Sequence, residues 1–154
     1  MKLEDEIKTS QFISQRHKLN VNLIYSYNWM ISRMQAVFRS NGVTLQQYNI
    51  LRILRGQYPN PSTIQLLKSR MLDKQPDASR LIDRLAAKEL VTRQVSRTDR
   101  RKMDVLISEK GLELLAGMEP DIEHFNNYSS CLSEEEVQQL NDLLDKMRDF
   151  GRED

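Results

Sequence analysis

Residues 44–107 contain three short segments with helical signals, followed by two short runs of β-branched residues. The first helix begins with a capping box, in which Thr44 and Gln47 satisfy orphan backbone N–H groups. The two runs, VTRQV and MDVLI, are separated by the polar, Arg-rich SRTDRRK, which predicts a β-hairpin with a long charged tip. Three helices followed by such a hairpin are typical of a winged helix-turn-helix. The predicted fold class is therefore mainly α with a small β-hairpin wing (α+β).

Proline and short polar residues set the expected limits of the second and third helices. We expect Asn60 to cap the second helix and Pro61 to fill its first position, so that the helix spans Ser62–Ser69. Asp73 is expected to cap the third helix, which would tolerate Pro76 in its first turn. The face of this third helix opposite its apolar residues is cationic.

Long amphipathic helices flank this central segment. No Gly or Pro occurs in residues 2–41, and apolar residues over Leu19–Phe38 alternate in steps of three and four, which predicts one helix of about 30 residues. Ser108 is expected to begin another helix, and Ser133 with Glu136 forms a capping box ahead of the last one.

The apolar stripes of these terminal helices need a partner, because the central segment supplies a compact core of its own. A second copy of the chain would bury them, and cyclic dimers are the commonest homo-oligomers. We therefore expect a homodimer. The chain is interpreted as a single domain over residues 1–154, with a winged helix-turn-helix DNA-binding lobe at 44–108 and a dimerisation lobe formed by 1–41 and 109–154.

Charge is strongly polarised along the chain, although the net formal charge is only +1. Residues 68–102 hold 11 Lys and Arg against 5 Asp and Glu, whereas residues 109–154 hold 4 against 13. A charge run alone is more often a solvated helix face, but here the cations coincide with the third helix and the hairpin tip. This placement favours double-stranded DNA as a partner, with the helix in the major groove and the tip over the minor groove.

Other functional classes are disfavoured by what the sequence lacks. The single cysteine, Cys131, rules out an internal disulfide and a disulfide-based sensor within one chain, and two histidines are too few for a strong transition-metal site. No spacing nominates a nucleophile, a general base or a phosphate-cradling glycine loop, so we expect no enzyme activity, no cofactor and no metal. The absence of a long apolar run and of a signal peptide predicts a cytoplasmic protein without a membrane partner.

Residues 77–111 read DASRLIDRLAAKELVTRQVSRTDRRKMDVLISEKG, which resembles the MarR family of bacterial transcriptional regulators. The resemblance is close over residues 44–116 and extends to the flanking helices in length and placement only. It implies a homodimeric repressor that binds a pseudo-palindromic operator through two winged-helix lobes and is released by a small-molecule effector. The alternative is a winged-helix module for protein–protein contacts without specific DNA binding.

The resemblance places DNA contacts of the third helix at Lys74, Gln75, Asp77, Ser79, Arg80 and Arg84. The first two are secondary contacts. Asp77 departs from the family: its carboxylate either accepts a hydrogen bond from a cytosine amino group or only complements the helix N-terminus. Asp83 could equally be half of an intramolecular ion pair. Glu89 stands where the family commonly has Gly, which predicts a differently shaped helix end.

In the hairpin tip, Asp99-Arg100-Arg101 resembles the Asp-x-Arg signature of the family. One arginine of this signature enters the minor groove, where a narrow A·T-rich groove concentrates negative potential. The sequence leaves open whether Arg100 or Arg101 inserts. Arg97 and Lys102 are expected to contact phosphates.

The resemblance also implies an effector pocket between the dimerisation lobe and the winged helix. Its expected occupant is a small aromatic or anionic molecule. We nominate His17, Tyr25 and Tyr48 as lining residues, although an aromatic residue at helical spacing more often belongs to the core.

Overall fold

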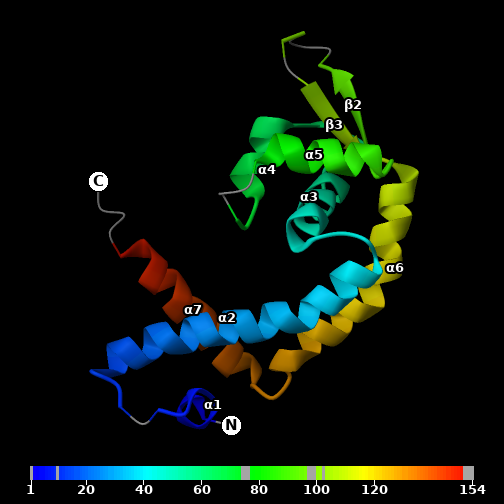
Figure 1. Ribbon diagram of the computed structural model, residues 1–154. Coiled ribbons are helices and arrows are strands. Elements are labelled where there is room, and N and C mark those ends of the chain that lie inside the picture. Colours follow the sequence, from blue (N-terminus) through cyan, green and yellow to red (C-terminus); the bar gives the residue numbers. More distant parts are fainter. Residues whose placement is uncertain (1, 10, 74–76, 97–99, 102, 151–154) are drawn as a thin grey trace. The chain divides into compact units, whose positions relative to one another are not determined.

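The computed structural model describes residues 2–9, 11–73, 77–96, 100–101 and 103–150 (Figure 1). These residues are mostly helical and include a three-stranded antiparallel sheet, which confirms the predicted fold class. The chain divides into two compact units, Met1–Ala116 and Gly117–Asp154. Within the described residues, no helix combines the length and apolarity needed to cross a bilayer.

The long N-terminal helix is shorter than expected and is preceded by a separate short one. Helix α1 spans Leu3–Ile7 and α2 spans Gln15–Ser40. The predicted helix of about 30 residues corresponds to α2, which has 26 residues; the segment before it forms α1, which ends where Lys8 has a left-handed backbone (φ 53°). A new helix then starts where the Ser14 hydroxyl accepts a hydrogen bond from the His17 N–H at 3.1 Å. At the other end, α2 stops at Ser40, and Asn41 is its C-cap.

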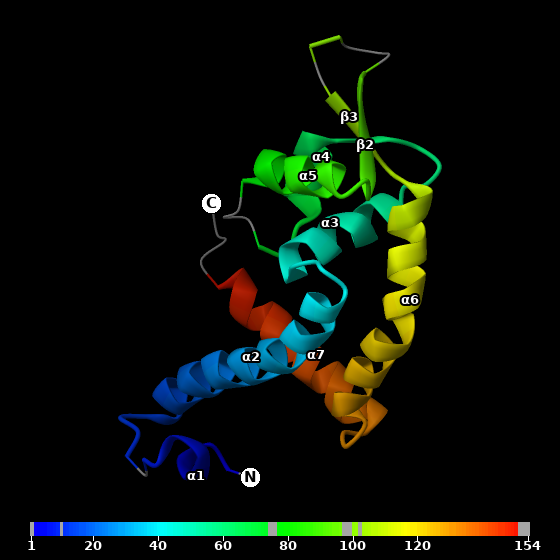
Figure 2. The same ribbon diagram turned by 45° about the vertical axis from the view of Figure 1, so that its right-hand side comes forward.

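Helices α3 (Leu45–Arg55), α4 (Ile64–Arg70) and α5 (Ala78–Ala87) lie together with the sheet in both views (Figures 1 and 2). The predicted Thr44–Gln47 capping box is present at the start of α3. Apolar side chains from these helices, the sheet and the helix that follows it form the core of the first unit: Ile50, Leu51, Leu54, Leu67, Ile82, Leu85, Val105 and Leu115.

The start of the second central helix is a correction. Asn60 does not cap it and Pro61 is not its first residue, because Ser62–Thr63 forms strand β1 and pairs with β3 (Met103–Ile107). The Thr63 hydroxyl instead accepts a hydrogen bond from the Leu66 N–H at 3.1 Å and caps α4. Local propensity favoured an earlier helix start, whereas backbone pairing with a distant strand holds Ser62 extended.

The third central helix also begins later than predicted. Its N-cap is Asp77 and not Asp73, so α5 starts at Ala78. Pro76, expected in its first turn, therefore precedes the helix in the chain and lies outside the described residues.

The predicted hairpin is present as β2 (Val91–Val95) and β3 (Met103–Ile107), with Val91 opposite Ile107 and Val95 opposite Met103. The sheet order is β1-β3-β2, with every pairing antiparallel. Strand β1, which the sequence did not suggest, covers the free edge of β3 beside the helices.

Helix α6 spans Glu109–Asn126 and continues through Pro120, and a short 3₁₀ turn, η1, follows at Asn127–Ser129. Helix α7 spans Glu134–Asp149 and begins with the predicted capping box of Ser133 and Glu136. The Ser108 hydroxyl accepts from the Gly111 N–H at 3.0 Å, which confirms Ser108 as the start of α6.

Candidate nucleic-acid interface

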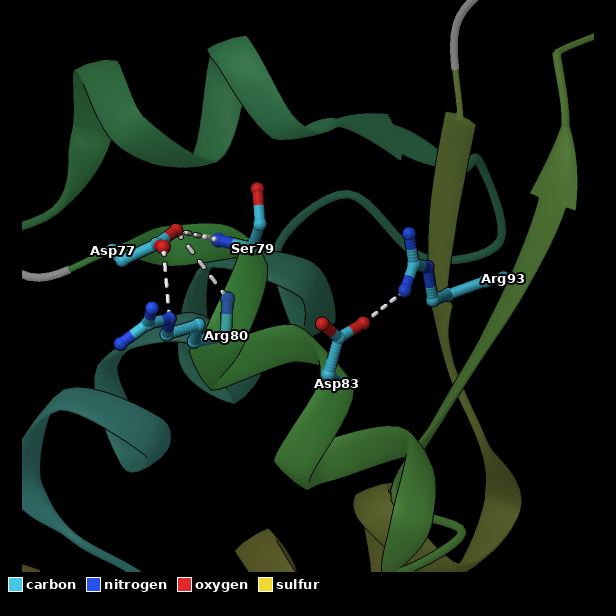
Figure 3. Close-up of polar contacts among 5 residues, drawn as sticks. All are labelled: Asp77, Ser79, Arg80, Asp83 and Arg93. Carbon is cyan, nitrogen blue, oxygen red and sulfur yellow. Dashed lines mark hydrogen bonds and ion pairs between the residues drawn. The ribbon is translucent and has the colours of Figure 1, made fainter.

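Asp77 builds the N-terminus of α5. Its Oδ1 accepts hydrogen bonds from the backbone N–H groups of Ser79 at 3.0 Å and Arg80 at 3.4 Å (Figure 3). Its Oδ2 lies 3.5 Å from the Arg80 Nε. Both carboxylate oxygens are therefore engaged within the helix start, where a negative charge also complements the helix dipole. The geometry favours capping over cytosine recognition as the role of Asp77.

Helix α5 has one buried and one exposed face. Ala78, Ile82 and Leu85 are completely buried, in the i, i+4 and i+7 positions expected of a helix packed on a core. The exposed face carries polar and charged side chains: Asp77, Ser79, Arg80, Asp83 and Arg84. Of the predicted contact residues on this helix, every described one thus lies on a solvent-accessible surface. Lys74 and Gln75 lie outside the described residues.

Asp83 forms an ion pair with Arg93 of β2, which resolves the alternative left open by the sequence (Figure 3). The pair ties the middle of α5 to the first strand of the hairpin. It also compensates the charge of Arg93, as Asp77 does for Arg80. Arg84, in contrast, forms no ion pair with another described residue and remains available to an external anion.

The hairpin presents a cationic turn. Arg100 and Arg101 are exposed and lie in a turn just before β3. The other predicted wing contacts, Arg97, Asp99 and Lys102, lie outside the described residues. Both described arginines are thus accessible to a nucleic-acid backbone or groove.

Glu89 gives the end of α5 a left-handed turn. Its φ is 63°, and the Leu90 N–H donates to the Leu85 carbonyl at 3.0 Å, closing the helix. The conformation is the one that glycine favours, although residue 89 is a glutamate. A helix end shaped differently from that of the family stays a prediction. Lys110 lies 2.8 Å from the carboxylate and lowers the pKa of Glu89 through a hydrogen bond and charge attraction.

Asn49 is a positioning residue that the sequence analysis missed. It is 4% exposed on α3, and its Oδ1 accepts a hydrogen bond from the Leu72 N–H at 3.1 Å. Leu72 lies just after α4, so the bond fixes the backbone at the end of that helix. The available signal was an amide residue among the apolar positions of a core helix, where a buried polar group requires a partner.

The three nominated effector residues lie at different places in the described structure. His17 lies at the start of α2, with its ring 5.8 Å from that of Phe12, and Tyr48 packs on Phe38 at 5.3 Å between ring centroids. Tyr25 is among the residues that line a cavity of about 340 Å³ between α1 and α2. The assignment of His17 and Tyr48 to an effector site stays a prediction.

The hydroxyl of Tyr25 donates a hydrogen bond to the Glu6 Oε2 at 2.5 Å. This bond, followed by burial and the nearby carboxylate charge, raises the pKa of Tyr25. The phenol therefore keeps its proton at neutral pH and links α1 to α2.

No cluster of His, Cys, Asp and Glu within the described residues could hold a metal ion. Cys131 is exposed, with its Sγ 3.9 Å from the Tyr128 carbonyl oxygen.

Comparisons with known proteins agree on one family. A model of the MarR family matches residues 41–102. The transcriptional regulator MhqR of Bacillus subtilis (strain 168) is 29% identical over 131 residues, which are 84% of this chain and 89% of MhqR. A MarR transcription factor from Planctomyces limnophilus is 29% identical, with a TM-score of 0.67 over 88% of this chain and 98% of its own.

A third relative is BpsR from Bordetella bronchiseptica, whose DNA binding is regulated by 6-hydroxynicotinic acid. It is 25% identical, with a TM-score of 0.73 over 82% of this chain and 90% of its own.

Proposed function

The chain belongs to the MarR family of transcriptional regulators, and from this we propose that it is a sequence-specific DNA-binding repressor acting in the bacterial cytoplasm. The observation that carries the proposal is the pairing of two exposed polar surfaces in one compact lobe. These are the exposed face of α5 and the Arg100–Arg101 turn of the hairpin.

In the proposed complex, α5 enters the major groove with its N-terminal half toward the base edges. Ser79 reads a base edge through its hydroxyl, and Arg84, which has no ion-pair partner among the described residues, contacts a guanine or a phosphate. Arg80 is held by Asp77 at the helix start and supplies positive charge near the backbone. Asp77 itself acts as a cap.

The hairpin would lie over the adjacent minor groove. One arginine of the Arg100–Arg101 pair enters the groove, where negative potential is concentrated, and the other contacts a phosphate or Asp99. The Asp83–Arg93 ion pair fixes the hairpin against α5, so that both surfaces meet the DNA in one register.

A homodimer would place two such lobes on a pseudo-palindromic operator. Support comes from large apolar side chains that remain exposed on α2 and α7: Leu19, Ile24, Tyr27, Met30, Leu140, Leu143 and Met147. A small effector is proposed by analogy with BpsR, whose DNA binding responds to a small ligand.

The test is fluorescence anisotropy with the DNA upstream of the protein's own gene and a shuffled control, at about 150 mM salt. We expect nanomolar binding to the first and roughly thousandfold weaker binding to the second. Affinity should fall steeply between about 50 and 200 mM salt. Absence of binding at low salt would instead support a module for protein contacts.

The double variant Arg100→Ala/Arg101→Ala should weaken operator binding by at least about 2 kcal/mol, roughly thirtyfold, because charge-assisted contacts are lost. The matched control is Arg16→Ala/Arg39→Ala, which removes two exposed arginines from α2 and leaves the hairpin intact. If the two double variants lose the same amount of operator affinity, the hairpin acts only through the net charge of the protein and does not belong to the DNA interface.

A further inference from the structure

A surface cavity of about 340 Å³ lies between α1 and α2, within the first compact unit. Glu6, Asn22 and Tyr25 are among its polar lining residues, and Leu3, Trp29 and Met30 supply apolar surface. Ligand sites begin at about 300 Å³, so the cavity fits a molecule of one or two rings. None of these residues belongs to α5 or to the hairpin.

The charge of the residues that line the cavity indicates whether a ligand should be positive or negative. Among the described residues that line the cavity, Glu6 is acidic and none is Lys, Arg or His. Tyr25 donates to the Oε2 of Glu6, whereas the Oε1 of Glu6 accepts no hydrogen bond from a described residue. The nearby Lys18 is committed to Glu4, with 2.5 Å between Nζ and Oε1. An anionic ligand would therefore meet the Glu6 carboxylate with no cation among the described lining residues, since Arg33, the cation beside Trp29, is stacked on that ring.

The aromatic lining suits a flat cation. The guanidinium of Arg33 lies over the Trp29 ring, 4.0 Å from its centroid, so one face of this indole already holds a flat cation, and a cationic ligand would use the opposite face or displace Arg33. Tyr25 offers a second ring, held in place by its bond to Glu6. Met30 adds a polarisable thioether that adapts to the edge of an aromatic ligand.

We propose that the cavity between α1 and α2 binds a small aromatic cation of the aryl amidine class. Glu6 pairs with the cationic group, and Trp29 and Tyr25 contact the ring. Of the two effector types expected from the sequence, aromatic or anionic, this cavity therefore favours the aromatic one, with a positive charge. The site stands independently of DNA binding, and its test needs no operator.

Trp29 is the single tryptophan of the chain, so intrinsic fluorescence reports directly on the cavity. The full-length protein is titrated with benzamidine, and with benzoate as an anion of matched size. We expect a saturable fluorescence change with benzamidine at about millimolar concentration or below, as its small size allows. Benzoate should bind at least about tenfold more weakly, because it meets Glu6 with like charge.

Three variants assign the binding to the cavity. Glu6→Gln should weaken benzamidine binding about tenfold, as expected for loss of a charge-assisted contact. Asp5→Asn is the matched control, because it removes an exposed carboxylate from the same helix but not from the cavity. Asn22→Asp adds a carboxylate to the cavity lining from α2 and should tighten benzamidine binding. Because this variant leaves the Glu6–Tyr25 bond in place, its result is informative even where Glu6→Gln loosens α1.

Saturation by benzamidine with this order of affinities supports the site. The proposal is overturned by the absence of a saturable change up to about 10 mM, well above the expected range. Equal affinity for benzoate would overturn it too, as would equal losses in Glu6→Gln and Asp5→Asn.

Discussion

At the scale of single residues, Glu89 occupies a backbone conformation that costs an L-amino acid free energy. Its φ of 63° lies in the left-handed region, where the side chain approaches the following carbonyl oxygen. Glycine avoids this clash. The Lys110 partner is a half-exposed surface cation and compensates little of the cost.

Glu89→Gly should therefore stabilise the protein and raise its Tm by about 2–4 °C, measured by thermal unfolding at pH 7. Lys110 lowers the pKa of Glu89 in the folded state, so the ion pair stabilises above the ordinary glutamate pKa and is lost as the pH falls. The gain in Tm should thus be larger at pH 4 than at pH 7. Glu89→Ala is the control, because alanine keeps the strained conformation, and an equal gain in that variant would contradict the backbone argument.

Two substitutions of Asp77 distinguish a capping role from a base-reading role. Asp77→Ala should destabilise the protein by about 0.5–2 kcal/mol in urea unfolding, because the Ser79 and Arg80 N–H groups lose their acceptor. Asp77→Asn keeps an oxygen acceptor and should retain most of the stability and the same operator preference. If Asp77→Asn changes the base preference of the operator, Asp77 contacts a cytosine and the capping interpretation is contradicted.

At the scale of elements, the junction between the sheet and α6 depends on close backbone approach. A Cβ at Gly111 would collide with the Leu90 carbonyl oxygen and lie 2.8 Å from the Ile107 Cγ1. The Ser108 N–H also donates to that Leu90 carbonyl, at 3.1 Å. The first turn of α6 is thus held against the end of α5 and β3 only because residue 111 lacks a side chain.

Two glycines of the same helix should respond in opposite directions to the same change. Gly111→Ala should destabilise by about 1–3 kcal/mol, since a backbone atom must move to admit the methyl group. At Gly117 the added Cβ meets nothing within 4 Å, and Gly117→Ala should stabilise by about 0.5–1 kcal/mol through helix propensity. Urea unfolding measures both, and matching signs would show that the packing at residue 111 is looser than described.

At the scale of the whole molecule, large apolar side chains are exposed on helices of both compact units in the part of the chain that the structure describes. On α7, Leu140, Leu143 and Met147 are 48%, 56% and 42% exposed, and Ile24 on α2 is 64% exposed. Scattered exposed leucines need no explanation, but residues spaced by three and four on one helix form a stripe. Such stripes support the proposed dimer.

Sedimentation should accordingly give a species of twice the 18.1 kDa chain mass at micromolar concentration. Leu143→Glu should shift the protein toward monomer, because a charge enters a surface that the partner would bury. Asn141→Glu adds the same charge at an exposed polar position of α7 and should leave the dimer intact. A monomeric wild-type protein would contradict the proposal.

The sequence by itself determined the features that depend on local chemistry. Capping boxes at Thr44 and Ser133 fixed two helix starts, because the partners lie three residues apart, and the β-branched runs fixed the hairpin. Cationic residues in the wing were also readable, since charge needs no tertiary context. The exposed face of α5 followed from helical periodicity.

Tertiary structure decided what depends on residues distant in the chain. Ser62 is in a strand because it pairs with Val105. Asp83 forms an ion pair with Arg93, which lies ten residues away in the next element. Asn49 accepts a hydrogen bond from the Leu72 N–H. The cavity beside Tyr25 exists only because α1 separates from α2 and returns to it through Glu4 and Glu6. Local propensity contributes a fraction of a kcal/mol per residue, and pairing and burial across the fold override it.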